Sequence, residues 1–145
     1  MIDGIIKTKQ KIITADNGSV YHGIKTNDNG YNGFGEVYFS SVNIDSIKAW
    51  KLHKKMTCNL LVLSGAVMFG FFDLRKSSSS YREKYKLQLS ITDYSRLTIP
   101  NGVWFGFKGL SKNLNLICNI ANMPHDPDEV SRKEVSEIDF DWEVK

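Results

Sequence analysis

The residues of this chain that could do chemistry gather in two short segments. Residues 50–53 read W-K-L-H, and residues 99–107 read I-P-N-G-V-W-F-G-F. His53 is the one histidine of the two segments, and its imidazole can accept or donate a proton near neutral pH. A lone imidazole cannot hold a divalent ion against water, because such sites need three or four converging ligands. We therefore expect chemistry at His53 to proceed without a metal and without a cofactor.

Both segments resemble the paired metal-binding motifs of cupins, H-x-H followed by a glutamate and P-x-G-x-x-H. Lys51 stands where the first histidine would be, and Phe105 stands where the last would be. No glutamate follows at the usual spacing, so His53 is the only ligand of the set that remains. The resemblance implies a cupin barrel whose metal site has been lost.

The elements that must position these residues are predicted to be strands. In almost every apolar segment, apolar residues alternate with polar ones or form short runs rich in β-branched and aromatic residues. Turn signals such as D-N-G at 16–18 and S-G at 64–65 separate these segments. Many short strands predict an all-β protein, a sandwich or barrel, with at most one short helix within 126–137. We expect strands over 37–42, 47–53, 59–63, 67–72, 85–90, 96–99 and 113–119.

Composition narrows the class of protein. The 145 residues predict a single domain over 1–145, with 41% apolar and 24% charged residues, as in ordinary globular proteins. The net charge of +3 is too weak for a nucleic-acid partner. No apolar run reaches the roughly 18 residues of a membrane span, and no signal peptide is evident, so we expect a cytoplasmic protein. Cys58 and Cys118 lie in or beside apolar runs and are predicted to be reduced and buried.

Four segments resemble, in order, the dTDP-4-dehydrorhamnose 3,5-epimerases. Residues 52–53 (L-H) stand where that family has the end of R-G-L-H, and residues 73–78 read D-L-R-K-S-S as the family does. Residues 99–107 are similar to the family's I-P-P-G-F-A-H-G-F, and residues 138–142 are similar to its terminal I-x-W. The resemblance spans about residues 35 to 142 and implies a homodimeric, cupin-type jelly roll that acts on a nucleotide sugar.

The resemblance also implies a chemistry. Members of the family abstract a proton beside a 4-keto group and return one on the opposite face, which requires a base, a cation for the enolate oxygen and an acid. His53 stands at the base. A strand that ends at His53 would point it to the same side as Lys51 and Ala49, and opposite to Leu52.

The other family positions have changed here. The family's lysine falls on Cys58, its acid tyrosine on Leu116, its pocket histidine on Phe105 and its arginine on Trp50. Trp50, Phe105 and Trp104 are interpreted either as a stacking wall for a base or sugar, or as filling of the barrel. A looser similarity links Val103-Trp104 to the G-V-W of the dTDP-sugar 3,4-ketoisomerases. We retain these positions, together with Lys48 and Lys51, as candidate substrate contacts.

Two hypotheses of different class follow. In the first, the chain is an isomerase in which His53 is the base and Lys51 or Lys48 contacts the diphosphate or the enolate oxygen. A tyrosine such as Tyr31 or Tyr38 would replace the missing acid. In the second, the barrel binds a nucleotide sugar or glycan without turning it over.

The segment around His125 leaves two interpretations open. His125 itself is predicted to be part of a loop. The neighbouring Asp126 or Asp128 is a weaker candidate for orienting a pocket histidine, because the family has an aspartate in this region.

Overall fold

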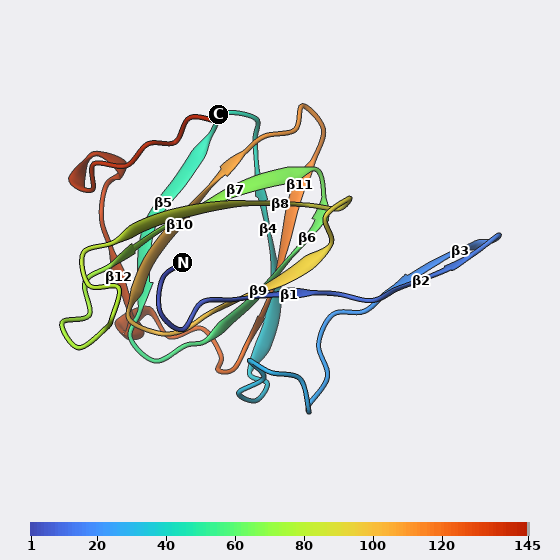
Figure 1. Ribbon diagram of the computed structural model, residues 1–145, viewed down its shortest axis with the longest axis horizontal. Helices are drawn as coiled ribbons and strands as arrows, with labels where there is room; N and C mark the ends of the chain where they lie inside the picture. The colour runs from blue at the N-terminus through green and yellow to red at the C-terminus, as the bar shows by residue number, and fades with distance from the viewer. Residues whose placement is uncertain (145) are drawn as a thin grey trace.

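The computed structural model describes residues 1–144, and its fold is built on two five-stranded antiparallel sheets (Figure 1). Sheet 1 contains, in spatial order, β1 (Ile6–Lys9), β9 (Ser95–Ile99), β6 (Cys58–Ser64), β11 (Asn115–Ala121) and β4 (Glu36–Val42). Sheet 2 contains β12 (Val130–Arg132), β5 (Ile47–His53), β10 (Val103–Gly109), β7 (Ala66–Asp73) and β8 (Lys84–Ser90). A separate hairpin of β2 (Ile12–Ala15) and β3 (Gly18–Tyr21) projects away from both sheets.

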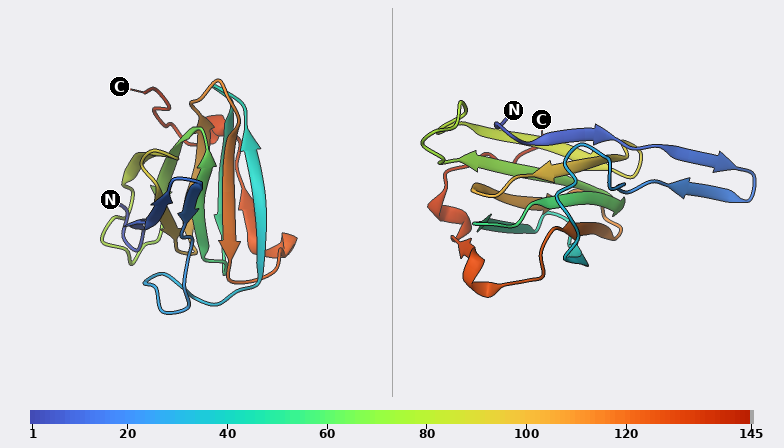
Figure 2. Two further views of the ribbon diagram at one scale, coloured as in Figure 1. Left: turned by 90° about the vertical axis from the view of Figure 1, so that its right-hand side faces the viewer. Right: turned by 90° about the horizontal axis from the view of Figure 1, so that it is seen from below.

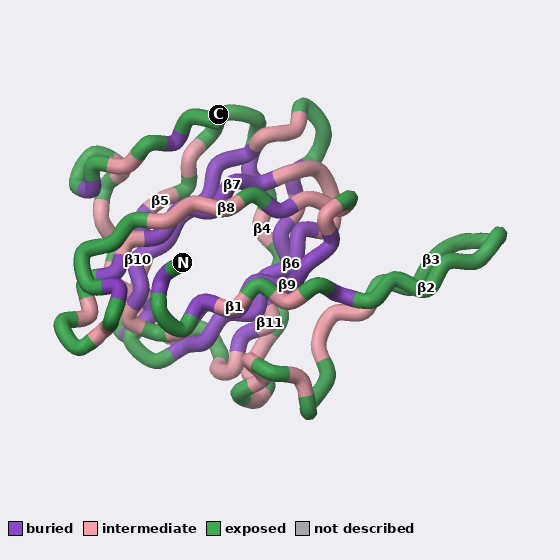
Figure 3. The backbone as a smooth tube through the Cα atoms, viewed as in Figure 1, coloured by how far each residue is buried: buried purple, intermediate pink, exposed green. Residues whose placement is uncertain are grey.

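The two sheets pack face to face and enclose the main core, as the turned views show (Figure 2). Side chains from both sheets, among them Val62, Leu97, Phe69 and Phe105, meet there with almost no exposed surface. The buried backbone runs through the middle strands, whereas the hairpin is exposed along its whole length (Figure 3). The short strands separated by turns predicted an all-β jelly roll, and the structure confirms it.

The strands expected from the sequence occur within one or two residues of their predicted bounds, but the helix expected within 126–137 was wrong. That stretch contains two single 3-10 turns, η1 (Pro127–Glu129) and η2 (Val135–Glu137), with β12 between them. Its backbone hydrogen bonds go to β5 instead, through the pairs Val130 with His53 and Arg132 with Lys51. Among residues 1–144, no helix is long and apolar enough to cross a membrane.

Sheet 2 is covered on its outer face as well. The C-terminal segment lays Ile138, Phe140 and Trp142 against Trp50 and Trp104, which form a second apolar cluster. The ring centroids of Trp50 and Trp142 lie 5.2 Å apart. Burial of both faces explains why β10 is buried along its entire length. The strand β10, which pairs with β5, is therefore held between two packed layers.

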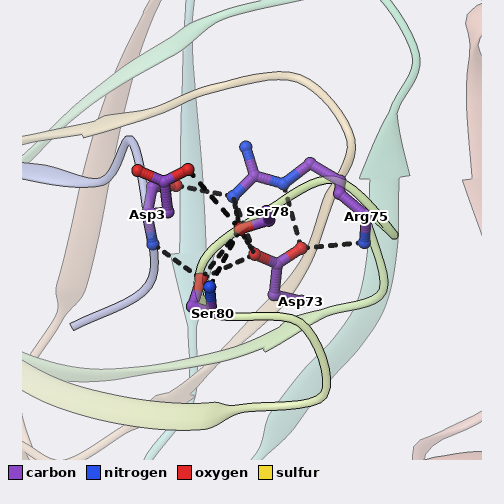
Figure 4. A network of polar contacts seen from close by, with 5 residues as sticks. All are labelled: Asp3, Asp73, Arg75, Ser78 and Ser80. Atoms are coloured by element: carbon purple, nitrogen blue, oxygen red, sulfur yellow. Dashed lines mark hydrogen bonds and ion pairs between the residues drawn. The ribbon is translucent and has the colours of Figure 1, made fainter.

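The D-L-R-K-S-S segment forms a network of hydrogen bonds at the end of β7 (Figure 4). Asp73, fully buried, accepts hydrogen bonds from the guanidinium of Arg75 and from the hydroxyls of Ser78 and Ser80 at 2.6–2.9 Å. Burial alone would raise the pKa of Asp73, but these donors hold it well below its usual range. Arg75 and Ser80 also bind the backbone of Asp3. The motif thus fastens the N-terminal segment to the β7–β8 loop.

Candidate functional site

The two segments singled out in the sequence meet at the end of β5. Gly102, at φ +84°, turns the chain into β10 and donates its backbone N–H to the carbonyl of His53 at 2.7 Å. The side chain of Asn101 donates to the carbonyl of Lys54 at 3.0 Å. On the other side, Val130 of β12 pairs with His53. The backbone of His53 is consequently fixed by two neighbouring strands and a turn.

A buried carboxylate orients the imidazole of His53. Nδ1 of His53 is hydrogen-bonded to Oε1 of Glu129, and both side chains are almost fully buried. The other oxygen of Glu129 accepts from the backbone N–H groups of Lys55 and Met56 at 3.0 and 3.3 Å. A neutral imidazole that donates from Nδ1 leaves a lone pair on Nε2. No residue among 1–144 hydrogen-bonds to that Nε2 atom.

The ionisation of the pair suits a base. Burial lowers the pKa of His53, and the nearby Lys51 and Arg132 charges add to this against the opposing effect of Glu129. Burial alone would raise the pKa of Glu129, but hydrogen bonds from His53 and from the backbone of Lys55 and Met56 lower it below its usual value. At neutral pH the favoured state is therefore a carboxylate beside a neutral imidazole, and the imidazole can accept a proton.

His53 lies on the wall of a cavity of about 740 Å³, a size typical of small-molecule sites. The wall combines strands of both sheets with residues on either side of η1. Its lining residues are Glu36, Tyr38 and Ser40 of β4, Lys48–Lys51 and His53 of β5, Phe107 of β10, and His125, Val130 and Arg132–Glu134 with Glu137. The Oε1 atom of Glu36 is buried without a hydrogen-bond partner among the described residues, as is Nε2 of His53. These two unsatisfied polar atoms, one from each sheet, mark a cavity prepared for a polar ligand.

Lys51 and Lys48 both point into this cavity. The ammonium group of Lys51 lies 5.0 Å from the centroid of the Phe105 ring, and that of Lys48 lies 5.8 Å from the Phe107 ring. Strict alternation would have placed Ala49 rather than Lys48 on this side. The pairing of β5 with β10 shifts between Phe105 and Phe107, and this bulge turns Lys48 inward while Ala49 packs against the outer cluster.

The cations of the cavity are largely uncompensated. Within residues 1–144, Lys48, Lys51 and Arg132 have no carboxylate partner, whereas Lys133 pairs with Glu137 at 3.3 Å. Burial is the largest influence on Lys51 and lowers its pKa, and the charges of Arg132 and Lys48 lower it further. Three unpaired cations outnumber the unpaired carboxylate of Glu36 in this cavity, and this excess favours an anionic ligand.

Cys58 and Phe105 lie behind the cavity wall, inside the main core. Burial raises the pKa of the Cys58 thiol to about 11. The thiol is therefore neutral and supplies neither a cation nor a nucleophile at neutral pH. The ring of Phe105 lies beside His53, with 6.0 Å between the ring centroids, so this neighbour of the imidazole is an apolar contact.

Three further candidates lie away from the cavity interior. Trp104 pairs with Leu52 and packs in the outer cluster, on the opposite face of β10 from Phe105. Trp50 borders the cavity, but its indole packs against Phe140 and Trp142 in the same outer cluster. Leu116 is on β11 and does not line the cavity. Their substrate contacts stay predictions, and this placement supports the alternative in which the tryptophans fill the fold.

Glu129 and Arg132 are the functional candidates that the sequence did not reveal. The expectation that Asp126 or Asp128 would orient a histidine was wrong: Asp126 caps the turn η1 by accepting from the N–H of Asp128. The turn delivers the next carboxylate, Glu129, to His53 instead. The sequence does show three carboxylates within 126–129. Which of them reaches His53 depends on the geometry of the turn η1, which the sequence alone does not give.

Comparison with known proteins gives a consistent result. Residues 46–145 match the family model described as dTDP-4-dehydrorhamnose 3,5-epimerase. A dTDP sugar isomerase from Desulfovibrio desulfuricans G20 is 30% identical, with a TM-score of 0.91 over 97% of this chain and 92% of that one. The spore coat polysaccharide biosynthesis protein SpsL of Bacillus subtilis strain 168 is 25% identical over 100% of this chain and 99% of its own.

A more distant structure shares the fold. The dTDP-4-dehydrorhamnose 3,5-epimerase of Bacillus anthracis strain Ames, solved with TDP and pyrophosphate bound, is 19% identical with a TM-score of 0.81. The match covers 98% of this chain and 86% of that one. The described strands thus form the same barrel as in these proteins.

Proposed function

Because this chain belongs to the dTDP-4-dehydrorhamnose 3,5-epimerase family, as its four motifs predicted, we propose that it is a metal-free epimerase or isomerase of a nucleotide-linked 4-keto-6-deoxy sugar. The observation that carries the proposal is the His53–Glu129 pair on the wall of a basic cavity. The polysaccharide-biosynthesis relative supports a role in surface polysaccharide or deoxysugar synthesis. The cytoplasm is the proposed location of this role.

His53 acts as the general base in this proposal. A hydrogen on the carbon next to a ketone is acidic because its removal gives an enolate. Nε2 of His53 removes this hydrogen while Glu129 holds the ring through Nδ1 and stabilises the imidazolium that forms. A positioned base of this kind contributes typically a hundredfold to ten-thousandfold in rate.

The cations of the cavity have two roles, stabilisation of the enolate and binding of the diphosphate. Lys51 lies in the cavity between His53 and Lys48 on β5 and is partly removed from water, so its ammonium group stabilises the developing enolate oxygen. Lys48 and Arg132 line the same cavity and meet the diphosphate. The nucleotide-bound relative from Bacillus anthracis supports a nucleoside diphosphate as the handle of the substrate.

Proton exchange tests the proposal. The protein is incubated in deuterated water with a panel of dTDP-, UDP- and GDP-linked 4-keto-6-deoxy sugars, and each sugar is followed by proton NMR. We expect deuterium to enter at a carbon next to the ketone of at least one sugar. Absence of exchange with every member of the panel would contradict the proposed reaction.

A second candidate function, binding without turnover, has its own support. The family's lysine position is Cys58, whose thiol stays neutral, and its acid position is Leu116, which does not line the cavity. A binding barrel would show heat on calorimetric titration with a nucleotide sugar but no exchange of a carbon-bound proton. At a hundredfold its dissociation constant, such a ligand would stabilise the fold by about 2.7 kcal/mol.

The proposed active form is a homodimer. Exposed apolar side chains on the outer face of β4, Val37 and Phe39, and on the projecting hairpin, Ile13, Val20 and Tyr21, support an interface between copies. Light scattering coupled to size exclusion should give twice the 16.5 kDa of one chain. A mass of one chain across the micromolar range would contradict this.

A further inference from the structure

Tyr38 faces the proposed base from the other sheet. It lies on β4 of sheet 1, whereas His53 lies on β5 of sheet 2, and both side chains line the same cavity. On β4 the residues alternate: Glu36, Tyr38 and Ser40 turn to the cavity, and Val37 and Phe39 turn outward. A sugar ring bound between the two sheets would therefore present one face to His53 and the other to Tyr38.

A neighbouring amide sets the orientation of the Tyr38 hydroxyl. Asn119 pairs directly with Tyr38 across β11 and β4, and its Nδ2 donates to the phenolic oxygen at 2.8 Å. That oxygen already accepts one hydrogen bond, and no residue among 1–144 accepts the proton that it carries. Burial is the largest influence on the pKa of Tyr38 and raises it, so the phenol keeps its proton at neutral pH.

We propose that Tyr38 is the proton donor that completes the epimerisation, on the face of the sugar opposite to His53. This inference rests on the proposed function. Tyr31, the other tyrosine that the sequence left open, lies in the loop before β4 and is not part of the cavity wall. Tyr38 thus replaces the acid that the family resemblance places at position 116, where Leu116 carries no dissociable proton.

The proton balance closes without any co-reactant. Nε2 of His53 takes the hydrogen from the carbon beside the ketone, and the electron pair moves into the enolate that Lys51 stabilises. The enolate carbon then takes the proton of the Tyr38 hydroxyl from the opposite face, which inverts the centre and leaves a phenolate. The imidazolium releases its proton to water in the open cavity, and the phenolate regains one from water.

The test separates exchange from inversion. Tyr38→Phe is compared with wild type, His53→Asn and the matched control Tyr31→Phe, using a sugar that wild type exchanges in deuterated water. In Tyr38→Phe we expect deuterium to enter with retained configuration, at a rate within about tenfold of wild type, because His53 can return a proton to its own face. Formation of the inverted product should fall about a hundredfold or more. Tyr31→Phe should behave as wild type, and Asn119→Ala should lower inversion more than exchange.

Three outcomes would overturn the inference. Inverted product from Tyr38→Phe at a rate close to wild type would show that another group delivers the proton. Loss of exchange together with inversion, in a variant that unfolds at the wild-type temperature, would place Tyr38 in binding or abstraction instead. No exchange by the wild type with any 4-keto sugar would defeat the proposed function itself, and the role of Tyr38 with it.

Discussion

Replacement of Glu129 by glutamine tests how the site is held together. The change keeps the shape of the side chain but removes the charge that faces Nδ1 of His53. A glutamine that turns its amide nitrogen to Nδ1 would force the imidazole proton onto Nε2, where it blocks the base. We expect kcat to fall about a hundredfold or more, with KM little changed, because general-base catalysis is worth at least that much.

The same change should lower stability by a predictable amount. Glu129 is 2% exposed and accepts three hydrogen bonds, from His53 and from the backbone of Lys55 and Met56. A hydrogen bond to a charged group is worth about 1.5–3 kcal/mol, and the change weakens all three, so we expect a loss of about 3 kcal/mol. For a domain of this size that loss lowers the melting temperature by about 10 °C.

The contribution of Glu129 to the free energy of unfolding should depend on pH. The folded pKa of Glu129 is below its ordinary value of 4.5, so the carboxylate stabilises the fold above that pH and the contribution is lost as the pH falls through the folded pKa. The difference in stability between wild type and Glu129→Gln, measured by urea unfolding from pH 7 to pH 3, should therefore shrink as the pH falls below 4.5. The exposed Glu83→Gln is the charge-matched control. A difference that stays constant with pH, or full activity of Glu129→Gln, would refute the account of this pair.

Three further predictions concern the cavity. Burial lowers the folded pKa of His53 below 6.5. We therefore expect kcat/KM to stay high as the pH falls to 6.5 and to drop only at lower pH. A drop in kcat/KM that begins above pH 6.5 would contradict a buried neutral base. Lys51→Met should lower kcat more than Lys48→Met, and the basic limb should lie below 10.5, since the ammonium group is lost as the pH rises through a lowered pKa. The Cys58 thiol, with a pKa of about 11, should resist iodoacetamide at pH 8 in the folded protein and react only after unfolding.

Strands at the sheet edges could be predicted because the sequences of β1, β4 and β8 keep an alternating pattern of apolar and polar residues. Lys51 was expected beside His53, and the structure places both on the cavity wall. The pattern fails where both faces of a strand are buried. On β10 every residue is buried, so alternation could not tell that Phe105 faces the main core and Trp104 faces the outer cluster.

The rest of the site depends on contacts that no local pattern encodes. Lys48 turns inward because of a bulge opposite Phe105 and Phe107, and a bulge shifts the register without leaving a sequence signal here. Glu129 reaches His53 because a short 3-10 turn and β12 bring a segment 76 residues away onto β5. Tyr38 acquires its proposed role from the pairing of β4 with β11, which sets Asn119 beside it.

The role of His53 as the base is tested most directly by comparing wild type with His53→Asn on one sugar that wild type exchanges. Asparagine is similar in shape but a far weaker base than imidazole. We expect exchange of the carbon-bound proton to fall by about a hundredfold to ten-thousandfold. The affinity for the nucleoside diphosphate, measured by calorimetry, should stay within about threefold, because the cations that contact the diphosphate are unchanged. Exchange at the wild-type rate in His53→Asn would show that the base lies elsewhere and would contradict the account.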